Sequence, residues 1–154
     1  VSGLVKSSGP IAAIYVVDPN PDLSKVLLVL VWVFVWEIGG QNIPADWNDT
    51  AEDKRVNAKT IPLHFGTQTA GMIVLFTLAL TVTFSLILPR VSPLTLGLPY
   101  LLASAFAGLI LLLKPGFDLF RQQSEGRMAA MLFDRASFYP MAQLAIIAAF
   151  VIFL

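Results

Sequence analysis

Three long windows without a charged residue constrain this chain more than any other feature of its sequence. The windows are residues 70–88, 91–113 and 136–154. A helix through any one of them is long enough to cross a hydrocarbon core of about 30 Å. A fourth apolar window, residues 23–40, carries charge only near its two ends. The sequence therefore predicts an all-α fold, a polytopic transmembrane helix bundle with about four full spans in a lipid bilayer.

The composition agrees with a membrane location and argues against several kinds of function. Apolar residues make up 56% of the 154 residues and charged residues 13%, about half the charged share of a typical soluble domain. Too few polar side chains remain to cover so much apolar surface in water. The net charge is zero, which argues against a nucleic-acid partner. Because the chain has no cysteine, it offers no thiol chemistry and no thiolate metal site.

The N-terminal segment 7–17 is apolar but too short to span a membrane alone. It also lacks the order of charged, apolar and cleavage regions that marks a signal peptide. We therefore interpret it as the end of a partial fifth helix. We expect residues 1–154 to form a single membrane-embedded unit that is the C-terminal part of a longer protein.

The basic residues fall unevenly on the connections between the apolar windows. Alternating spans place the loops 41–69 and 114–135 on one side of the membrane, and that side carries seven of the ten basic residues. These seven are Lys54, Arg55, Lys59, Lys114, Arg121, Arg127 and Arg135. The other side carries Lys6, Lys25 and Arg90. Because positive charge favours the cytoplasm, we expect a multi-pass protein of the cell membrane with both loops facing the cytoplasm.

Residues 114–135 mix phenylalanine, methionine and leucine with charged residues. This mixture is typical of an amphipathic segment that lies at the membrane interface. A solvated linker is the alternative interpretation. On the opposite side, Pro89 and Pro93 suit a tight reversal between two antiparallel spans.

The loop 41–69 holds acidic residues followed by basic ones, in the stretch QNIPADWNDTAEDKRVNAKT. If residues 42–53 form a helix, Asn42, Asp46, Asp49 and Asp53 lie along one face of it. Pro44 is compatible with the first turn of such a helix. We expect the glycines at 39 and 40 to break this helix from the preceding span.

Carboxylates at this spacing repel one another unless a cation offsets their charge. Mg²⁺ typically binds one or two carboxylates together with the phosphates of a substrate. The acidic stripe is therefore a candidate Mg²⁺–diphosphate site, and Lys59 could contact the phosphate oxygens that the metal leaves free. A charged, solvated loop without a ligand is the alternative.

Two further residues could take part in chemistry. Glu37 lies near the end of the first full span, where an acid in lipid indicates function, although it could instead reach the interface. His64 is the chain's single histidine, and an interfacial or packed side chain is the favoured interpretation for it.

The stretch Asp49-Thr-Ala-Glu-Asp53, followed by Asn57, Lys59-Thr60 and Phe65-Gly66, resembles the second aspartate-rich motif of the UbiA superfamily of membrane prenyltransferases. That motif has D-x-x-x-D, a glycine four residues later, then Lys with Ser or Thr, and a further glycine. The sequence departs from it at Asn57, where the family usually has glycine. Asparagine tolerates left-handed backbone angles better than other non-glycine residues, so the departure is small. The segments GPIAAIY and FDRASFYP also resemble parts of that family.

The resemblance implies a bundle of about nine helices with two aspartate-rich motifs that bind Mg²⁺ and an isoprenyl diphosphate. It implies that Asp49 and Asp53 are metal ligands, that Asp46 and Asn42 are auxiliary, and that Lys59 contacts the diphosphate. The implied reaction is the transfer of an isoprenyl group from a prenyl diphosphate to a hydrophobic, often aromatic, acceptor. The family's first motif is absent from these residues, so we expect them to be inactive without the missing part.

Two other functions stay open on sequence grounds. A CDP-alcohol phosphotransferase also uses aspartates on a membrane helix, but the D-G-x-x-A-R start of its motif is missing. A non-enzymatic transporter or assembly subunit could use Glu37 in the membrane and the acidic loop as a surface. The sequence does not identify the acceptor.

Overall fold

The computed structural model of the chain describes residues 2–91, 96–122 and 126–153, and every regular element in this part is helical. The α-helices are α1 (Ser2–Val17), α2 (Leu23–Glu37), α3 (Ile43–Asn48), α4 (Thr50–Arg55), α5 (Ile61–Ile87), α6 (Leu98–Gly108), α7 (Lys114–Gln122) and α8 (Gly126–Phe153). Two π-helical segments, Ile38–Asn42 and Leu109–Leu113, join α2 to α3 and α6 to α7. A short 3-10 turn, Leu88–Val91, follows α5.

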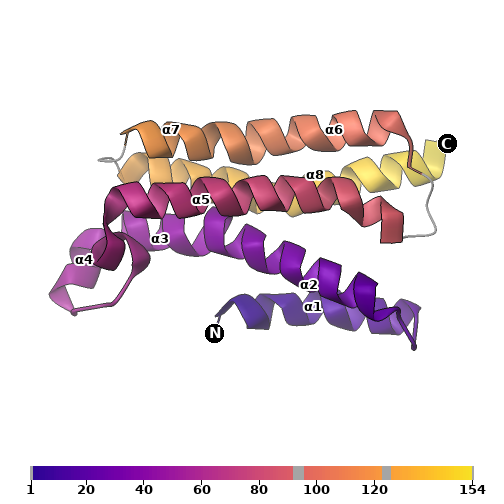
Figure 1. Ribbon diagram of the computed structural model, residues 1–154, viewed down its shortest axis with the longest axis horizontal. Helices are drawn as coiled ribbons and strands as arrows, with labels where there is room; N and C mark the ends of the chain where they lie inside the picture. The colour runs from indigo at the N-terminus through magenta and orange to yellow at the C-terminus, as the bar shows by residue number, and fades with distance from the viewer. Residues whose placement is uncertain (1, 92–95, 123–125, 154) are drawn as a thin grey trace.

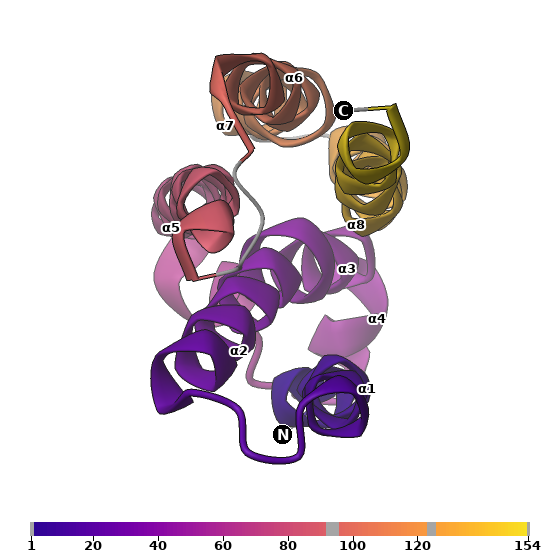
Figure 2. The same cartoon turned by 90° about the vertical axis from the view of Figure 1, so that its right-hand side faces the viewer.

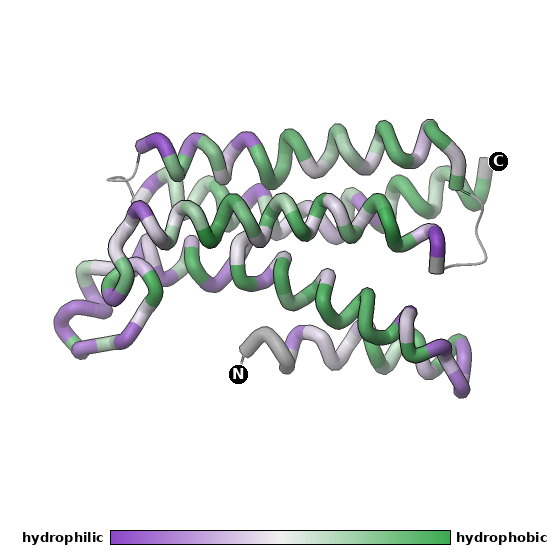
Figure 3. Tube along the Cα trace, in the orientation of Figure 1, coloured by the Kyte–Doolittle hydropathy of each residue, from purple (hydrophilic) through white to green (hydrophobic). Residues whose placement is uncertain are grey.

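Four helices are long and apolar enough to cross a membrane. They are Leu23–Asn48, Ile61–Arg90, Leu98–Gln122 and Gly126–Ile152. Figure 3 shows that apolar residues dominate the middle of these helices, with polar residues gathered toward the ends of the molecule. The predicted polytopic bundle with four full spans is confirmed. The N-terminal segment is also helical, as expected, and forms part of α1.

The four spans pack around a common core, as Figures 1 and 2 show. The continuous helix of α2 and α3 packs on α5 and α8, and α6 and α7 pack on both α5 and α8. The core residues include Ile43, Trp47, Val74, Leu78, Leu112, Leu119, Leu132 and Tyr139. Helix α1 lies outside this group, against α2.

Ser85 on α5 connects three other helices by hydrogen bonds. Trp32 Nε1 on α2 and the Tyr139 hydroxyl on α8 each donate to Ser85 Oγ at 2.8 Å. The Tyr100 hydroxyl on α6 donates to the Ser85 carbonyl oxygen at 2.9 Å. Inside lipid, buried polar groups need such internal partners. Ser85 therefore fixes the relative positions of the four spans.

The predicted helix break at Gly39 and Gly40 is wrong. Both glycines are buried in the π-helical segment that continues α2 into α3. A side chain on Gly39 would collide with Thr77 Oγ1 on α5, and a Cβ on Gly40 would lie 2.8 Å from the Ala136 Cβ on α8. These glycines thus permit close approach of helices and do not end one.

The alternative interpretation of residues 114–135 as a solvated linker is wrong for the part that the structure describes. Residues 114–122 form α7, which continues the third span, and residues 126–135 are the beginning of α8. Leu119 is fully buried in the core, so α7 packs inside the bundle. The third span accordingly lies at residues 98–122 and extends further toward the C-terminus than the uncharged window predicts. Pro93 and residues 123–125 lie outside the described residues.

Candidate functional site

The acidic stretch folds as two short helices that meet at Asp49, so the predicted single helix through residues 42–53 is wrong. The backbone of Asp49 has φ −94° and ψ 11°. Its N–H donates to the Ala45 carbonyl at 3.0 Å, which completes α3. Its carbonyl oxygen accepts from the N–H groups of Glu52 and Asp53 at 2.9 and 3.0 Å, which begins α4. Asp49 therefore occupies the corner between the two helices.

The corner still gathers the three predicted aspartates. Asp46 on α3 is partly buried, and the carboxylates of Asp53 and Asp49 are close enough to repel a negative charge on it. Asp49 is exposed and Asp53 is half-buried. Asn42 ends the π-helical segment, four residues before Asp46 on the same continuous helix. The structure thus groups three like charges at the polar end of the bundle beside α4 (Figures 1 and 3).

A C-terminal cap on α4 turns the chain toward the basic part of the motif. Asn57 has φ 53°, in the left-handed region. The Ala58 N–H donates to the Asp53 carbonyl at 2.9 Å, and the Asn57 N–H donates to the Lys54 carbonyl at 3.4 Å. These two bonds form a Schellman motif, in which glycine or asparagine takes the left-handed position. The structure thus gives the reason why asparagine can replace glycine here.

Lys59 and Thr60 follow this cap and begin α5. Lys59 is exposed and forms no ion pair within the described ranges. Thr60 has extended backbone angles ahead of α5 and makes no side-chain capping bond. Its hydroxyl oxygen is buried and has no hydrogen-bond partner in the described part of the chain. The pair therefore offers a free cation and a free hydroxyl at the start of a long helix.

Gly66 interrupts the first turns of α5. Its φ of 82° and ψ of 161° are not helical, and this backbone region is essentially restricted to glycine. The glycine that the motif requires at this position therefore bends the start of α5. His64, next to this bend, is exposed and packs edge-to-face on Phe65 with ring centroids 4.7 Å apart.

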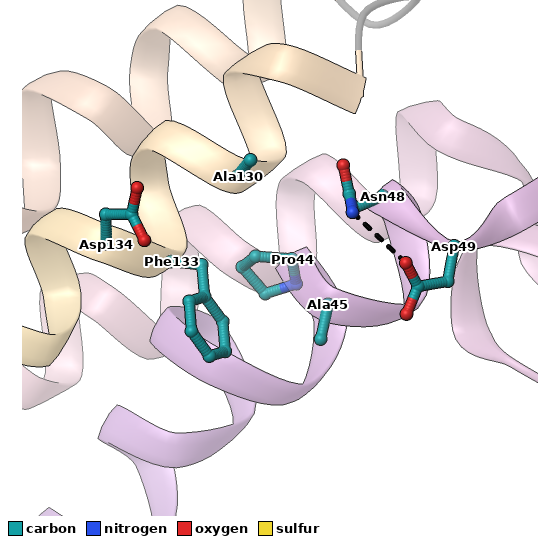
Figure 4. A pocket seen from close by; sticks show the side chains of 7 residues that line it. All are labelled: Pro44, Ala45, Asn48, Asp49, Ala130, Phe133 and Asp134. Carbon is teal, nitrogen blue, oxygen red and sulfur yellow. Dashed lines mark hydrogen bonds between the residues drawn. The ribbon is translucent and has the colours of Figure 1, made fainter.

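A cavity of about 230 Å³ lies between α3 and α8 beside the corner. Figure 4 shows its lining, to which α3 and the corner contribute Asn48 and Asp49 and α8 contributes Asp134. Asn48 Nδ2 donates to Asp49 Oδ1 at 3.1 Å. Asp134 could not be identified from the sequence, because its position in the chain gives no local signal that α8 packs against α3.

The aspartate corner alone does not form a complete metal cage. Within the described residues, no three His, Cys, Asp or Glu side chains form a group that could hold a metal ion. Mg²⁺ normally completes its shell with water and substrate phosphates around one or two carboxylates. A cation at this corner would therefore need a further ligand, such as a diphosphate, to complete its shell.

A model of the UbiA prenyltransferase family matches residues 1–139. No curated protein and no solved structure gives a significant match. The matched range contains the aspartate corner, Lys59 and Thr60, and it extends into α8.

Proposed function

The chain belongs to the UbiA prenyltransferase family, and we propose that it contributes the second diphosphate site of a Mg²⁺-dependent prenyltransferase. Membership of the family implies transfer of an isoprenyl group from a prenyl donor in a membrane environment. It favours this activity over a CDP-alcohol phosphotransferase and over a non-enzymatic transporter or assembly subunit. The acceptor we propose is hydrophobic, and an aromatic ring would suit the chemistry.

The repulsion of Asp46 by Asp49 and Asp53, at a corner that is followed in sequence by an exposed Lys59, is the observation that carries the proposal. Asp46 is subject to the charges of Asp53 and Asp49, which disfavours the site while it is empty. A divalent cation would remove that repulsion. Lys59 begins the next part of the motif and forms no ion pair in the described residues, so it is available to an anion.

Each group has a separate role in the proposed mechanism. Asp49 and Asp53, with Asp46 beside them, would hold Mg²⁺, which supplies neutralisation of the charge on the departing diphosphate. Lys59 would bind a phosphate oxygen as a point charge, and the Thr60 hydroxyl would donate a hydrogen bond to another. The carbon–oxygen bond to the diphosphate breaks and its electron pair leaves with the diphosphate, the acceptor forms a bond to the allylic carbon, and the acceptor then loses a proton to the released diphosphate or to water. The apolar helices exclude water, which would otherwise react with the allylic cation that forms when the diphosphate leaves.

The test uses the protein from its complete reading frame in lipid nanodiscs. Binding of farnesyl diphosphate with and without Mg²⁺ is measured by calorimetry, and pyrophosphate release is assayed with an aromatic acceptor. We expect Asp49→Asn and Asp53→Asn each to weaken donor binding at least about tenfold, because each removes a charged contact.

Glu52→Gln is the matched control. Glu52 lies on α4 between the two aspartates in sequence and is exposed, yet it has no role in the proposed site. We expect this variant to bind the donor as the parent protein does. An equal loss of donor binding in all three variants would show that only the overall negative charge of this region matters. Donor binding that does not depend on Mg²⁺ would overturn the proposal.

A further inference from the structure

Glu37 is a buried carboxylate that the proposed mechanism does not use. Its side chain is 0% exposed, and neither of its oxygens receives a hydrogen bond from any described residue. An ionised carboxylate can accept about four hydrogen bonds, and a buried polar group without them is costly. The chain therefore keeps hydrogen-bond acceptors open inside the membrane bundle.

Among the described residues, Lys6 is the one that forms an ion pair with Glu37. Its Nζ lies 3.5 Å from Glu37 Oε1, and the Lys6 side chain is 48% exposed. The lysine lies on α1, which packs on the outside of the bundle against α2. The ion pair is thus at the edge of the bundle, where movement of a flexible lysine side chain would give a ligand access to the carboxylate.

The position of Glu37 relates it to the aspartate corner. Glu37 ends α2, and the helix continues through the π-helical segment into α3. Asp46 follows nine residues later on the same continuous helix. A π-helical segment between two such positions is itself frequent at functional sites.

We propose that Glu37 accepts a hydrogen bond from a hydroxyl or amino group of the acceptor, and so selects acceptors that carry such a donor. This inference rests on the proposed prenyl transfer. Lys6 lies against Oε1, and Oε2, which has no hydrogen-bond partner among the described residues, would pair with the acceptor. A site built to pair with a hydroxyl discriminates strongly against an analogue that lacks it, because the buried group is then left unpaired.

The test compares two acceptor probes that differ in a single hydrogen-bond donor. Binding of 1-naphthol and of 1-methoxynaphthalene is measured by equilibrium dialysis against the complete protein in detergent micelles, with protein-free micelles as the blank. We expect the parent protein to bind the naphthol at least about tenfold more tightly. Glu37→Gln should reduce this ratio, and Glu37→Met should bring it to about one.

Three further measurements separate this role from a structural one. Asp18→Asn removes the acid of an exposed ion pair between Asp18 and Lys25 and should leave the ratio unchanged. Farnesyl diphosphate binding and the melting temperature of Glu37→Gln should match those of the parent protein. A parent protein that binds both probes equally, or neither, would overturn the inference even if it binds the donor. Failure to bind the donor would instead overturn the proposed function.

Discussion

Asn57 shows how one residue controls the approach to the candidate site. Its φ of 53° closes the Schellman cap that ends α4. The chain can then reverse and bring Lys59 and Thr60 to the start of α5. A left-handed conformation costs other non-glycine residues roughly 1–2 kcal/mol. The identity of this residue therefore affects the order of the whole motif.

We predict that Asn57→Ala loosens this cap, whereas Asn57→Gly does not. In the alanine variant, the free energy of opening the cap should fall by about 1 kcal/mol. The cap is therefore open more often. Amide hydrogen exchange of Ala58, whose N–H bonds to the Asp53 carbonyl, reports this opening directly. Faster exchange in both variants, or in neither, would show that the left-handed conformation is not the determining factor.

The bend at Gly66 acts on a whole helix, because the backbone conformation of this residue sets the direction of the first residues of α5. Because its backbone angles are restricted to glycine, Gly66→Ala should cost about 1–3 kcal/mol and turn the first residues of α5 away from the corner. No atom lies within 4 Å of the position that an added Cβ would take, so backbone strain is the only cause of this loss. We expect weaker farnesyl diphosphate binding, measured by calorimetry.

Gly9→Ala is the matched control for this substitution. A Cβ at Gly9 would also meet nothing within 4 Å, but Gly9 lies inside α1, where alanine is favoured over glycine. This variant should keep its donor affinity. A loss of equal size at both positions would argue against a specific role for the bend.

The continuous helix of α2 and α3 contacts α8 through a pair of small residues, Gly40 and Ala136. We predict that Gly40→Ala lowers the melting temperature in micelles, because overpacking of this kind costs about 1–3 kcal/mol. Adding Ala136→Gly removes the atom that would lie at 2.8 Å and should restore part of the loss. If the two effects simply add, the helices do not meet as the structure shows.

The sequence predicts which elements exist better than it predicts where they end. Apolar windows, three of them without a charged residue, identify all four spans, because few structures other than a membrane-spanning helix need so long an apolar stretch. Helical hydrogen bonding does not stop at the first charge, however. Lys114 and Asp118 lie within α7, although the window ends before them. Similarly, Asp134 and Asp49 line the same cavity only because distant helices meet there, which local spacing does not encode.

At the scale of the whole molecule, the distribution of polar residues defines two ends. Helix α4 and the start of α5 lie at one end, and the turn between α1 and α2 lies at the other (Figures 1 and 3). Sequence analysis counts Lys6 with the second end. The structure places it beside Glu37, so Lys25 and Arg90 remain there. The excess of positive charge at the end that carries the aspartate corner is thus larger than the sequence indicates.

We therefore predict that the aspartate corner faces the cytoplasm. The residues described contain no cysteine, so Glu52→Cys and Asn20→Cys can be made as single labelling sites, both at exposed positions. In intact cells, a membrane-impermeant maleimide should label the Asn20→Cys variant alone, and in inverted vesicles the Glu52→Cys variant alone. Detergent should make both reactive. Labelling of the Glu52→Cys variant from outside would reverse the orientation. The donor would then have to reach the corner from the extracytoplasmic side, although a diphosphate cannot cross the hydrocarbon core unaided.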